Sequence, residues 1–180
     1  MPNIFILSDL HLGHTNVLKF TVADGSLLRP GFANIDEHDD FIIDSINEIV
    51  NPKDRLILVG DCVMNKLYMH KLNRINGKKT LVMGNHDPTD PQYLTPYFEK
   101  LAGALPLSEF ILTHIPVHEL QVQHRFKGNI HGHLHDGDVK LKWGVNDPRY
   151  FNVCCEKLNY KPIAFEDLKK QFYARDFSRC

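Results

Sequence analysis

Seven side chains that can bind a metal ion occur along this 180-residue chain, in groups that follow short apolar runs. They are carboxylates, one amide and imidazoles: Asp9, His11, Asp61, Asn85, His114, His133 and His135. This donor set suits Mn²⁺, Fe²⁺/³⁺, Zn²⁺, Co²⁺ or Ni²⁺, whereas a closed structural zinc site usually contains thiolates. Seven donors exceed the need of one ion but would serve two ions that share a carboxylate. Two ions about 3.5–4 Å apart are the usual arrangement for in-line displacement at phosphorus.

The apolar runs that precede these residues predict buried strands. They are rich in Ile, Val and Leu, end abruptly in small or polar residues, and lie at residues 3–7, 55–59, 80–83, 110–112 and 128–130. Short runs of this composition, bounded by Gly, Asp or Pro, are typical of strands covered on both faces. Ligands of open α/β sheets bind at the carboxyl ends of strands, and every Asp, Asn and His group lies at such an end.

Helical patterns lie between the predicted strands. Residues 34–50 repeat apolar side chains at helical spacing, with Asn34 as the expected N-cap and Glu37 three residues further on. Residues 67–75 and 165–172 predict two shorter helices, and residues 152–153 and 161–165 resemble a closing hairpin. Alternation of strands and helices indicates an α/β domain.

Composition excludes several classes of protein. The length fits one domain over residues 1–180, and 43% hydrophobic residues suffice for a buried core. The 21 Lys and Arg residues against 22 Asp and Glu residues give a net charge of −1, which argues against a protein that coats long nucleic acid or an anionic membrane. The apolar runs are too short to span a membrane, no secretory signal is evident, and the four cysteines have no C-x-x-C spacing. We therefore expect a cytoplasmic protein; the oligomeric state does not follow from the sequence.

The order of the motifs resembles that of the calcineurin-like metallophosphoesterases, and particularly their small single-domain bacterial and phage members. The motifs fall within residues 4–135 and are Asp9-x-His11, Gly60-Asp61, Gly84-Asn85-His86-Asp87, His114 after a strand, and Gly132-His133-Leu134-His135. One of them alone occurs by chance in many chains, whereas all five in this order are specific. The resemblance implies a two-sheet α-β-β-α sandwich with the metal site at the carboxyl ends of the strands.

The resemblance also implies a role for each residue. Two divalent metal ions are expected, Mn²⁺ first and Fe, Zn, Ni or Co as alternatives. Asp61 would be shared between them, joining Asp9, His11 and His135 on one ion with Asn85, His114 and His133 on the other. A hydroxide held between the ions would attack phosphorus. His86 would protonate the leaving oxygen as a general acid, and Asp87 would orient its ring.

The implied activity is that of a phosphatase or phosphodiesterase acting on a small, nucleotide-like phosphorylated substrate. A nuclease or a protein phosphatase using the same site is the alternative, and a non-catalytic binding scaffold is a third hypothesis. His14 and Asn16 lie in a loop expected to face the site, where they either contact substrate phosphate or form an ordinary turn. Arg29 lies in the long loop 12–33 and either clamps a phosphate or is solvated.

Overall fold

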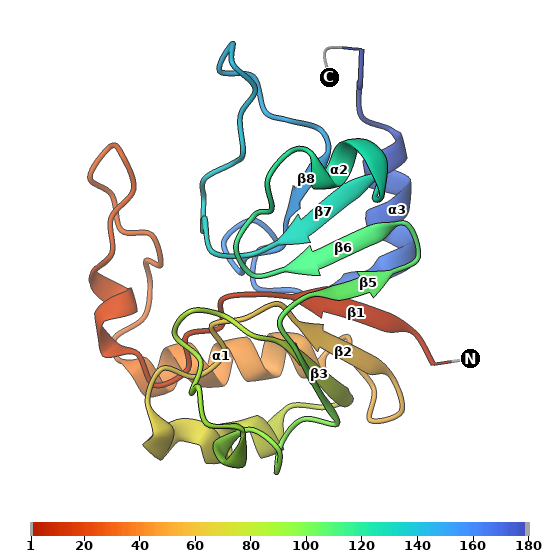
Figure 1. The fold of residues 1–180 in the computed structure, drawn as a ribbon. Helices are drawn as coiled ribbons and strands as arrows, with labels where there is room; N and C mark the ends of the chain where they lie inside the picture. The colour runs from red at the N-terminus through yellow and green to blue at the C-terminus, as the bar shows by residue number, and fades with distance from the viewer. Residues whose placement is uncertain (1, 179–180) are drawn as a thin grey trace.

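The computed structural model describes residues 2–178, which form two β-sheets with helices packed against them (Figure 1). The strands are β1 (Ile4–Leu7), β2 (Arg55–Leu58), β3 (Lys78–Val82), β4 (Lys100–Ala102), β5 (Leu105–Leu107), β6 (Phe110–Thr113), β7 (Gly128–His131), β8 (Tyr150–Asn152) and β9 (Ile163–Ala164). One sheet has the order β4-β3-β2-β1-β9 and the other the order β5-β6-β7-β8. The expected two-sheet α/β fold is confirmed.

Most neighbouring strands are parallel. β1 to β4 run parallel to one another, as do β6 to β8, whereas β9 pairs antiparallel with β1 and β5 pairs antiparallel with β6. In register, Ile6 of β1 lies beside Ile57 of β2, which lies beside Thr80 of β3. Figure 1 shows that β1, β6 and β7 end on the same side of the molecule. The loops that follow strands of both sheets therefore meet on that side.

Side chains of the five-stranded sheet alternate between two hydrophobic cores. Leu7 and Leu58 belong to the core beneath the first helix, whereas Ile6, Ile57 and Val82 belong to the core shared with the four-stranded sheet. Alternation follows from the two-residue period of a strand. Because both faces are covered, the buried carboxyl-terminal parts of these strands are apolar, as the sequence indicated.

The first helix, α1 (Ile35–Asn47), begins where the sequence predicts. The Asn34 side chain accepts a hydrogen bond of 2.9 Å from the backbone N–H of Glu37, and the Glu37 carboxylate accepts one of 2.8 Å from the N–H of Ala33. Ile42 and Ile46, one turn apart, are fully buried in the first core. Reciprocal capping of this kind satisfies backbone groups that a helix start leaves free.

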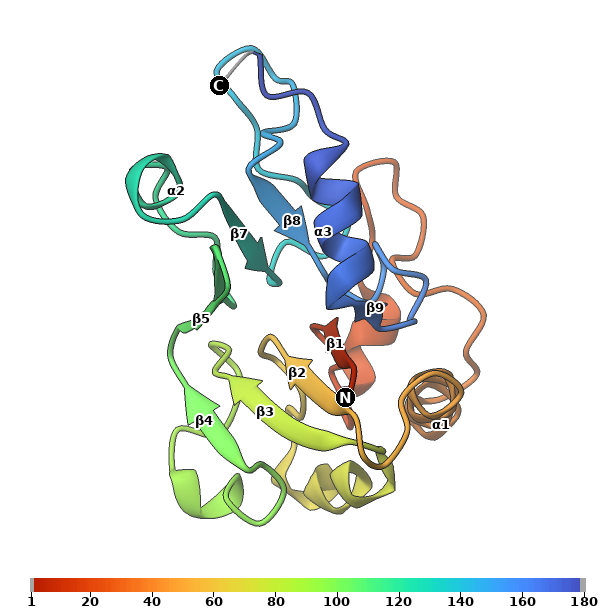
Figure 2. The same ribbon diagram turned by 90° about the vertical axis from the view of Figure 1, so that its right-hand side faces the viewer.

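The last helix, α3 (Phe165–Tyr173), closes the second core. Figure 2 shows it lying along β8 and β9. Its Phe172 ring packs edge-on against Phe110 of β6, with centroids 4.9 Å apart. The four-residue helix α2 (Gln121–His124) precedes β7. Among residues 2–178, no helix has the length and apolar character needed to cross a membrane.

Three local expectations are corrected. The segment predicted as a helix over residues 67–75 is a 3₁₀ helix, η2 (Lys66–Arg74), because nine residues cannot distinguish a period of 3.0 from one of 3.6. The closing hairpin is wrong: β8 pairs with β7 and β9 with β1, in different sheets. The strands β4 and β5 were not predicted, since runs of three residues carry almost no periodic signal.

Candidate metal centre

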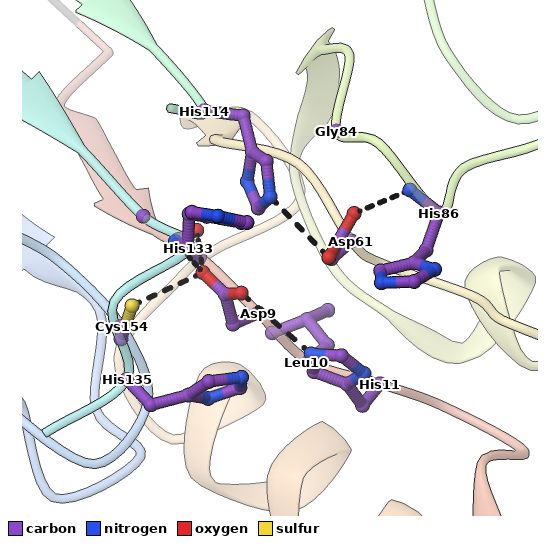
Figure 3. Close-up of polar contacts among 12 residues, drawn as sticks. Asp9, Leu10, His11, Asp61, Gly84, His86, His114, His133, His135 and Cys154 are labelled. Carbon is purple, nitrogen blue, oxygen red and sulfur yellow. Dashed lines mark hydrogen bonds and ion pairs between the residues drawn. The ribbon is translucent and has the colours of Figure 1, made fainter. Parts of the chain in front are cut away.

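Polar residues from five strand ends meet in one pocket (Figure 3). Asp9 and His11 follow β1, Asp61 follows β2, Asn85 and His86 follow β3, His114 follows β6, and His133 and His135 follow β7. Two groups have potential ligand atoms within 4.8 Å of one another: Asp9 with His11 and His135, and Asp9 with Asp61 and His114. The Asp9 carboxylate belongs to both groups.

The structure does not test which carboxylate two ions would share. The resemblance implies Asp61. The two groups of close ligand atoms have Asp9 in common, and no group within residues 2–178 joins Asp61 to His11 and His135. The other two predicted ligands lie beside the second group. Asn85 Oδ1 is 3.0 Å from His114 Nε2, and the His133 ring is 5.2 Å from the His114 ring between centroids. Their role as ligands stays a prediction.

The backbone at this pocket is conformationally unusual. Five of the predicted ligands have a positive φ: Asp9 (59°), His11 (54°), Asp61 (51°), His133 (69°) and His135 (51°). The left-handed region costs about 1–2 kcal/mol for a residue with a Cβ and is found mostly for Asn, Asp and His among non-glycine residues. Such strain concentrates at functional sites, where neighbouring interactions enforce it. Here the N–H of Asp9 donates to Gly60 O at 3.1 Å, and the N–H of His11 donates to Asp61 O at 3.0 Å.

Asp9 is buried and only partly hydrogen-bonded. Its Oδ2 accepts from the Ser8 hydroxyl, from the Cys154 thiol at 3.1 Å and from the His133 N–H at 3.0 Å. Its Oδ1 and the His11 Nε2 lie 3.6 Å apart, and both are buried without a hydrogen-bond partner among the described residues. Buried polar atoms are nearly always paired, so two adjacent exceptions fit a site that a cation would complete.

The ionisation of the two carboxylates also fits metal binding. Burial alone would raise the pKa of Asp9, but the imidazoles of His11 and His114 nearby hold its pKa below the usual range. Burial likewise opposes ionisation of Asp61, and the nearby His114 lowers the pKa of Asp61 overall. His114 Nδ1 donates to Val59 O at 2.9 Å, so Nε2 is the nitrogen that faces the pocket, 3.3 Å from Asp61 Oδ2 and 3.0 Å from Asn85 Oδ1. Metal ligands must be deprotonated, and the lowered pKa values of Asp9 and Asp61 favour that state for both carboxylates.

A buried ion pair supports the other end of the pocket. His135 Nδ1 donates to Glu156 Oε1 at 3.1 Å, and the same oxygen accepts from Arg29 Nε at 2.7 Å. Arg29 also donates to the backbone oxygens of Asp9, at 2.5 Å, and Leu10, at 3.1 Å. A carboxylate behind a histidine fixes its tautomer and orients the other nitrogen toward a metal. Sequence reasoning missed Glu156, because no motif signals a contact made 127 residues from Arg29.

The position of Arg29 does not fit the predicted substrate contact. Arg29 is 1% exposed, and its guanidinium is occupied by Glu156, two carbonyls and His38 Nε2 at 2.9 Å. It can reach neither solvent nor a phosphate. His38 is fully buried in the same network, with Nδ1 2.9 Å from Asp39 Oδ1. Arg29, in the long loop before α1, therefore lies in the interior and stabilises the structure through these contacts.

His86 lies at the exposed side of the pocket. Its backbone N–H donates to Asp61 Oδ1 at 2.9 Å, and its ring centroid is 6.5 Å from that of His11. Asp87 does not have the expected position behind the His86 ring. Its buried carboxylate accepts the N–H groups of Asp61, Cys62 and Gly84 at 2.8–2.9 Å, and no hydrogen bond within the described chain joins it to the ring. Asp87 fastens the β3 loop to the β2 loop.

The two tentative substrate contacts near the first motif have different surroundings. His14 is half-buried and stacks on His11, with the two Nδ1 atoms 3.2 Å apart. Phe20 packs edge-on against both His14 and His135, so these three rings cover the His11 end of the pocket. Asn16 is exposed in the 3₁₀ helix η1 (Thr15–Lys19). His14 is therefore adjacent to the pocket, and whether either residue contacts substrate stays a prediction.

Two glycines allow the loops to meet. A Cβ on Gly84 would overlap Asp61 Oδ1 and its backbone nitrogen, and a Cβ on Gly132 would overlap Ser8 Oγ and Asp9 Oδ2. The motifs Gly84-Asn85 and Gly132-His133 thus carry glycine because another loop packs directly against the backbone. This close approach brings the donors of separate strands within reach of one ion.

Comparison with known proteins places the fold. No protein-family model matches the chain. It is 28% identical over 176 residues to an uncharacterized protein of Methanocaldococcus jannaschii (MJ1445), covering 94% of this chain and 91% of that protein. A crystal structure of a protein of unknown function from Aquifex aeolicus (AQ665) matches with a TM-score of 0.70 and 22% identity, covering 94% of this chain and 99% of that one. An archaeal phosphodiesterase matches with a TM-score of 0.45 and 16% identity, over 83% and 82% of the two chains.

The Aquifex likeness shows a shared fold over nearly the whole chain. The chemistry of the site must be argued from this chain's own residues, since one fold serves many functions. Those residues form an Asp/His cluster with ionised carboxylates and unpartnered buried donor atoms, which is the composition of a metal-binding site.

Proposed function

We propose that this chain is a metallophosphoesterase of the calcineurin-like type, which hydrolyses a small, nucleotide-like phosphorylated substrate with two divalent cations. The observation that carries the proposal is the position of Asp9, whose carboxylate belongs to two separate groups of potential ligands. A carboxylate common to two donor sets is what a two-ion phosphoesterase site requires.

The expected ligands are those of the sequence motifs, with Mn²⁺ as the first candidate: Asp9, His11, Asp61, Asn85, His114, His133 and His135. Divalent cations in such a site supply Lewis-acid stabilisation of the phosphoryl oxygens and lower the pKa of a water molecule.

The chain itself contributes a proton donor and its support. His86 is exposed at the edge of the pocket, where its imidazole can donate a proton to the leaving oxygen of an ester. General acid catalysis of this kind contributes about 10²–10⁴ in rate. Asp61 fixes the backbone of His86, and Asp87 holds the turn that carries it. The support is therefore through the main chain, which leaves the ring free to exchange protons with solvent.

The test is metal binding and hydrolysis by the full chain and by Asp9→Asn. After removal of metal and titration with Mn²⁺, we expect about two ions per wild-type chain and metal-dependent cleavage of p-nitrophenyl phosphate or bis(p-nitrophenyl) phosphate. Asp9→Asn keeps the shape of the side chain but removes the charge common to both groups. Its turnover should fall about a thousandfold or more, the equivalent of several kcal/mol of transition-state stabilisation.

Asp44→Asn is the matched control, because Asp44 is exposed on α1 and should leave both measurements unchanged. Hydrolysis by Asp9→Asn at the wild-type rate would contradict the proposal. A wild-type chain that binds no Mn²⁺ would favour the binding scaffold instead.

A further inference from the structure

A groove opens from one end of the candidate metal centre. It has a volume of about 320 Å³ and lies between the loops that follow β3, β4 and β6, lined by Met83, Gly84, Asn85, Gly103, Thr113, His114 and Ile115. Asn85 and His114 line both the groove and the pocket of Asp/His residues. In Figure 3, His114 and Gly84 lie on the side of Asp61 away from His11 and His135. The groove therefore extends the site at the end that the ring of Phe20 does not cover.

The lining of the groove is uncharged apart from the histidine. Ile115 is 52% exposed, Met83 is half-buried, and neither lysine, arginine, aspartate nor glutamate contributes to the walls. Gly103 gives the groove room, because its Cβ position meets no atom within 4 Å. Larger cavities elsewhere, of about 370 and 550 Å³, include none of the seven predicted ligands. The groove is thus a space continuous with the centre and without charges to bind a second anion.

We propose that this groove binds the uncharged organic group of the substrate, of the size of an aromatic ring or a nucleobase, while the phosphoryl group occupies the centre. The proposal rests on the phosphoesterase function above and refines its substrate class. Ligand sites of about 300–1,000 Å³ with mainly apolar walls and a few polar groups are typical of small-molecule recognition, and this groove lies at the lower limit. Esters that carry further phosphates are disfavoured, because no cationic side chain of the lining would compensate their charge.

The test compares two phosphonates that differ only in the organic group. Binding of phenylphosphonate and methylphosphonate to the Mn²⁺-loaded wild-type chain is measured by calorimetry. Burial of a phenyl ring in the groove should make phenylphosphonate bind about tenfold or more tightly than methylphosphonate. Neither compound can be hydrolysed at phosphorus, so the readout is independent of turnover.

The decisive variant is Gly103→Leu. Gly103 is not in the left-handed region and has open space at its Cβ, so a leucine should fill the groove without disturbing the fold. This variant should bind the two phosphonates within about twofold of each other while its affinity for methylphosphonate stays at the wild-type value. Ala104→Leu is the matched control, since Ala104 is exposed, is the next residue, and lines a different cavity. It should retain the preference for the phenyl compound.

The outcomes separate this proposal from the function on which it rests. If wild type binds methylphosphonate but shows no phenyl preference, or if Gly103→Leu keeps that preference, the groove proposal is overturned and the phosphoesterase stands. If neither phosphonate binds the Mn²⁺-loaded chain, both are overturned.

Discussion

The two ends of the candidate metal centre are built in opposite ways. At the His11 and His135 end, side chains are buried or half-buried, and the ion pair of Arg29 and Glu156 fixes them from behind. At the Asn85 end, Asn85 and His86 are exposed, and a groove without charged side chains begins there. We propose that the two ends have different roles: one would hold metal ligands in a fixed geometry, and the other would admit the organic group of a substrate and exchange protons with solvent.

Burial of the ion pair at the His11 and His135 end costs free energy. Removing a guanidinium and a carboxylate from water has a desolvation cost that their attraction offsets only with good geometry and further hydrogen bonds. Arg29 meets this condition with four acceptors, including two main-chain oxygens within the first motif. Burial opposes ionisation of Glu156, but His135 and Arg29 lower its pKa overall. We infer that this pair is retained for its effect on the centre, and the predictions below test that difference between the two ends.

The largest expected effect is on stability, from Arg29→Met. The substitution leaves the buried Glu156 carboxylate without its guanidinium partner, with His135 as its remaining donor, and deprives the carbonyls of Asp9 and Leu10 of a donor. Loss of one partner of a buried pair costs about 3–5 kcal/mol. The free energy of unfolding, measured by urea denaturation without added metal, should fall by this amount. Arg74→Met is the control: it removes an exposed ion pair with Asp40 and should change the free energy of unfolding by less than about 1 kcal/mol. Similar losses of unfolding free energy in the two variants would contradict the structural role assigned to the buried ion pair.

Next in size is the effect of Glu156→Gln on metal affinity. The amide keeps the shape of the side chain but not the charge behind His135, and loss of such a partner typically weakens metal binding about 10–100-fold. Mn²⁺ titration calorimetry measures the change, with circular dichroism to verify folding. The control is Glu166→Gln, an exposed partner of Lys169 on α3. An unchanged affinity would make the ion pair a feature of the fold alone.

Alanine substitutions at Gly84, in a closely packed loop, and at Gly103, in the open groove, should have different effects on stability. In Gly84→Ala the new methyl group would overlap Asp61, so the β3 loop must move, at a cost of about 1–3 kcal/mol. In Gly103→Ala the methyl group enters free space, and stability should change by no more than about 0.5 kcal/mol. Urea denaturation of both variants measures the difference. Equal stability of the two would show that the loops do not depend on close approach.

The smallest expected effect is that of Asp54, which lies outside the candidate metal centre. It serves as a reference for the pH dependence of stability. Hydrogen bonds from the N–H groups of Asn51 and Asn3 hold the pKa of Asp54 below its usual range. The unfolded chain therefore binds this proton more readily, and the stabilisation is present above the unfolded pKa of about 3.8 and is lost as pH falls through the folded pKa. The stability difference between wild type and Asp54→Asn should shrink as pH falls below about 4, with Mn²⁺ affinity unchanged. A constant difference would contradict the assignment.

Local patterns were sufficient for the parts of the fold that repeat along the chain. The apolar runs of β1 and β2 and the capping residues Asn34 and Glu37 each carry their signal within a few residues, and they lie where predicted. The same holds for the convergence of the motif residues, since parallel strands end on one side. Partners across the sheets carry no such signal. The pairing of β9 with β1, the burial of Arg29 and the position of Glu156 depend on contacts more than a hundred residues apart in sequence.

The left-handed backbone at five of the predicted ligands restricts which residues these positions accept. Valine, isoleucine and threonine are nearly excluded there by their branched side chains, whereas aspartate, asparagine and histidine tolerate the conformation best. Those three tolerated types are also hard and borderline metal donors. The backbone conformation and metal coordination thus favour the same few residue types, so stability alone would favour keeping these types at the five positions, whether or not a metal binds there.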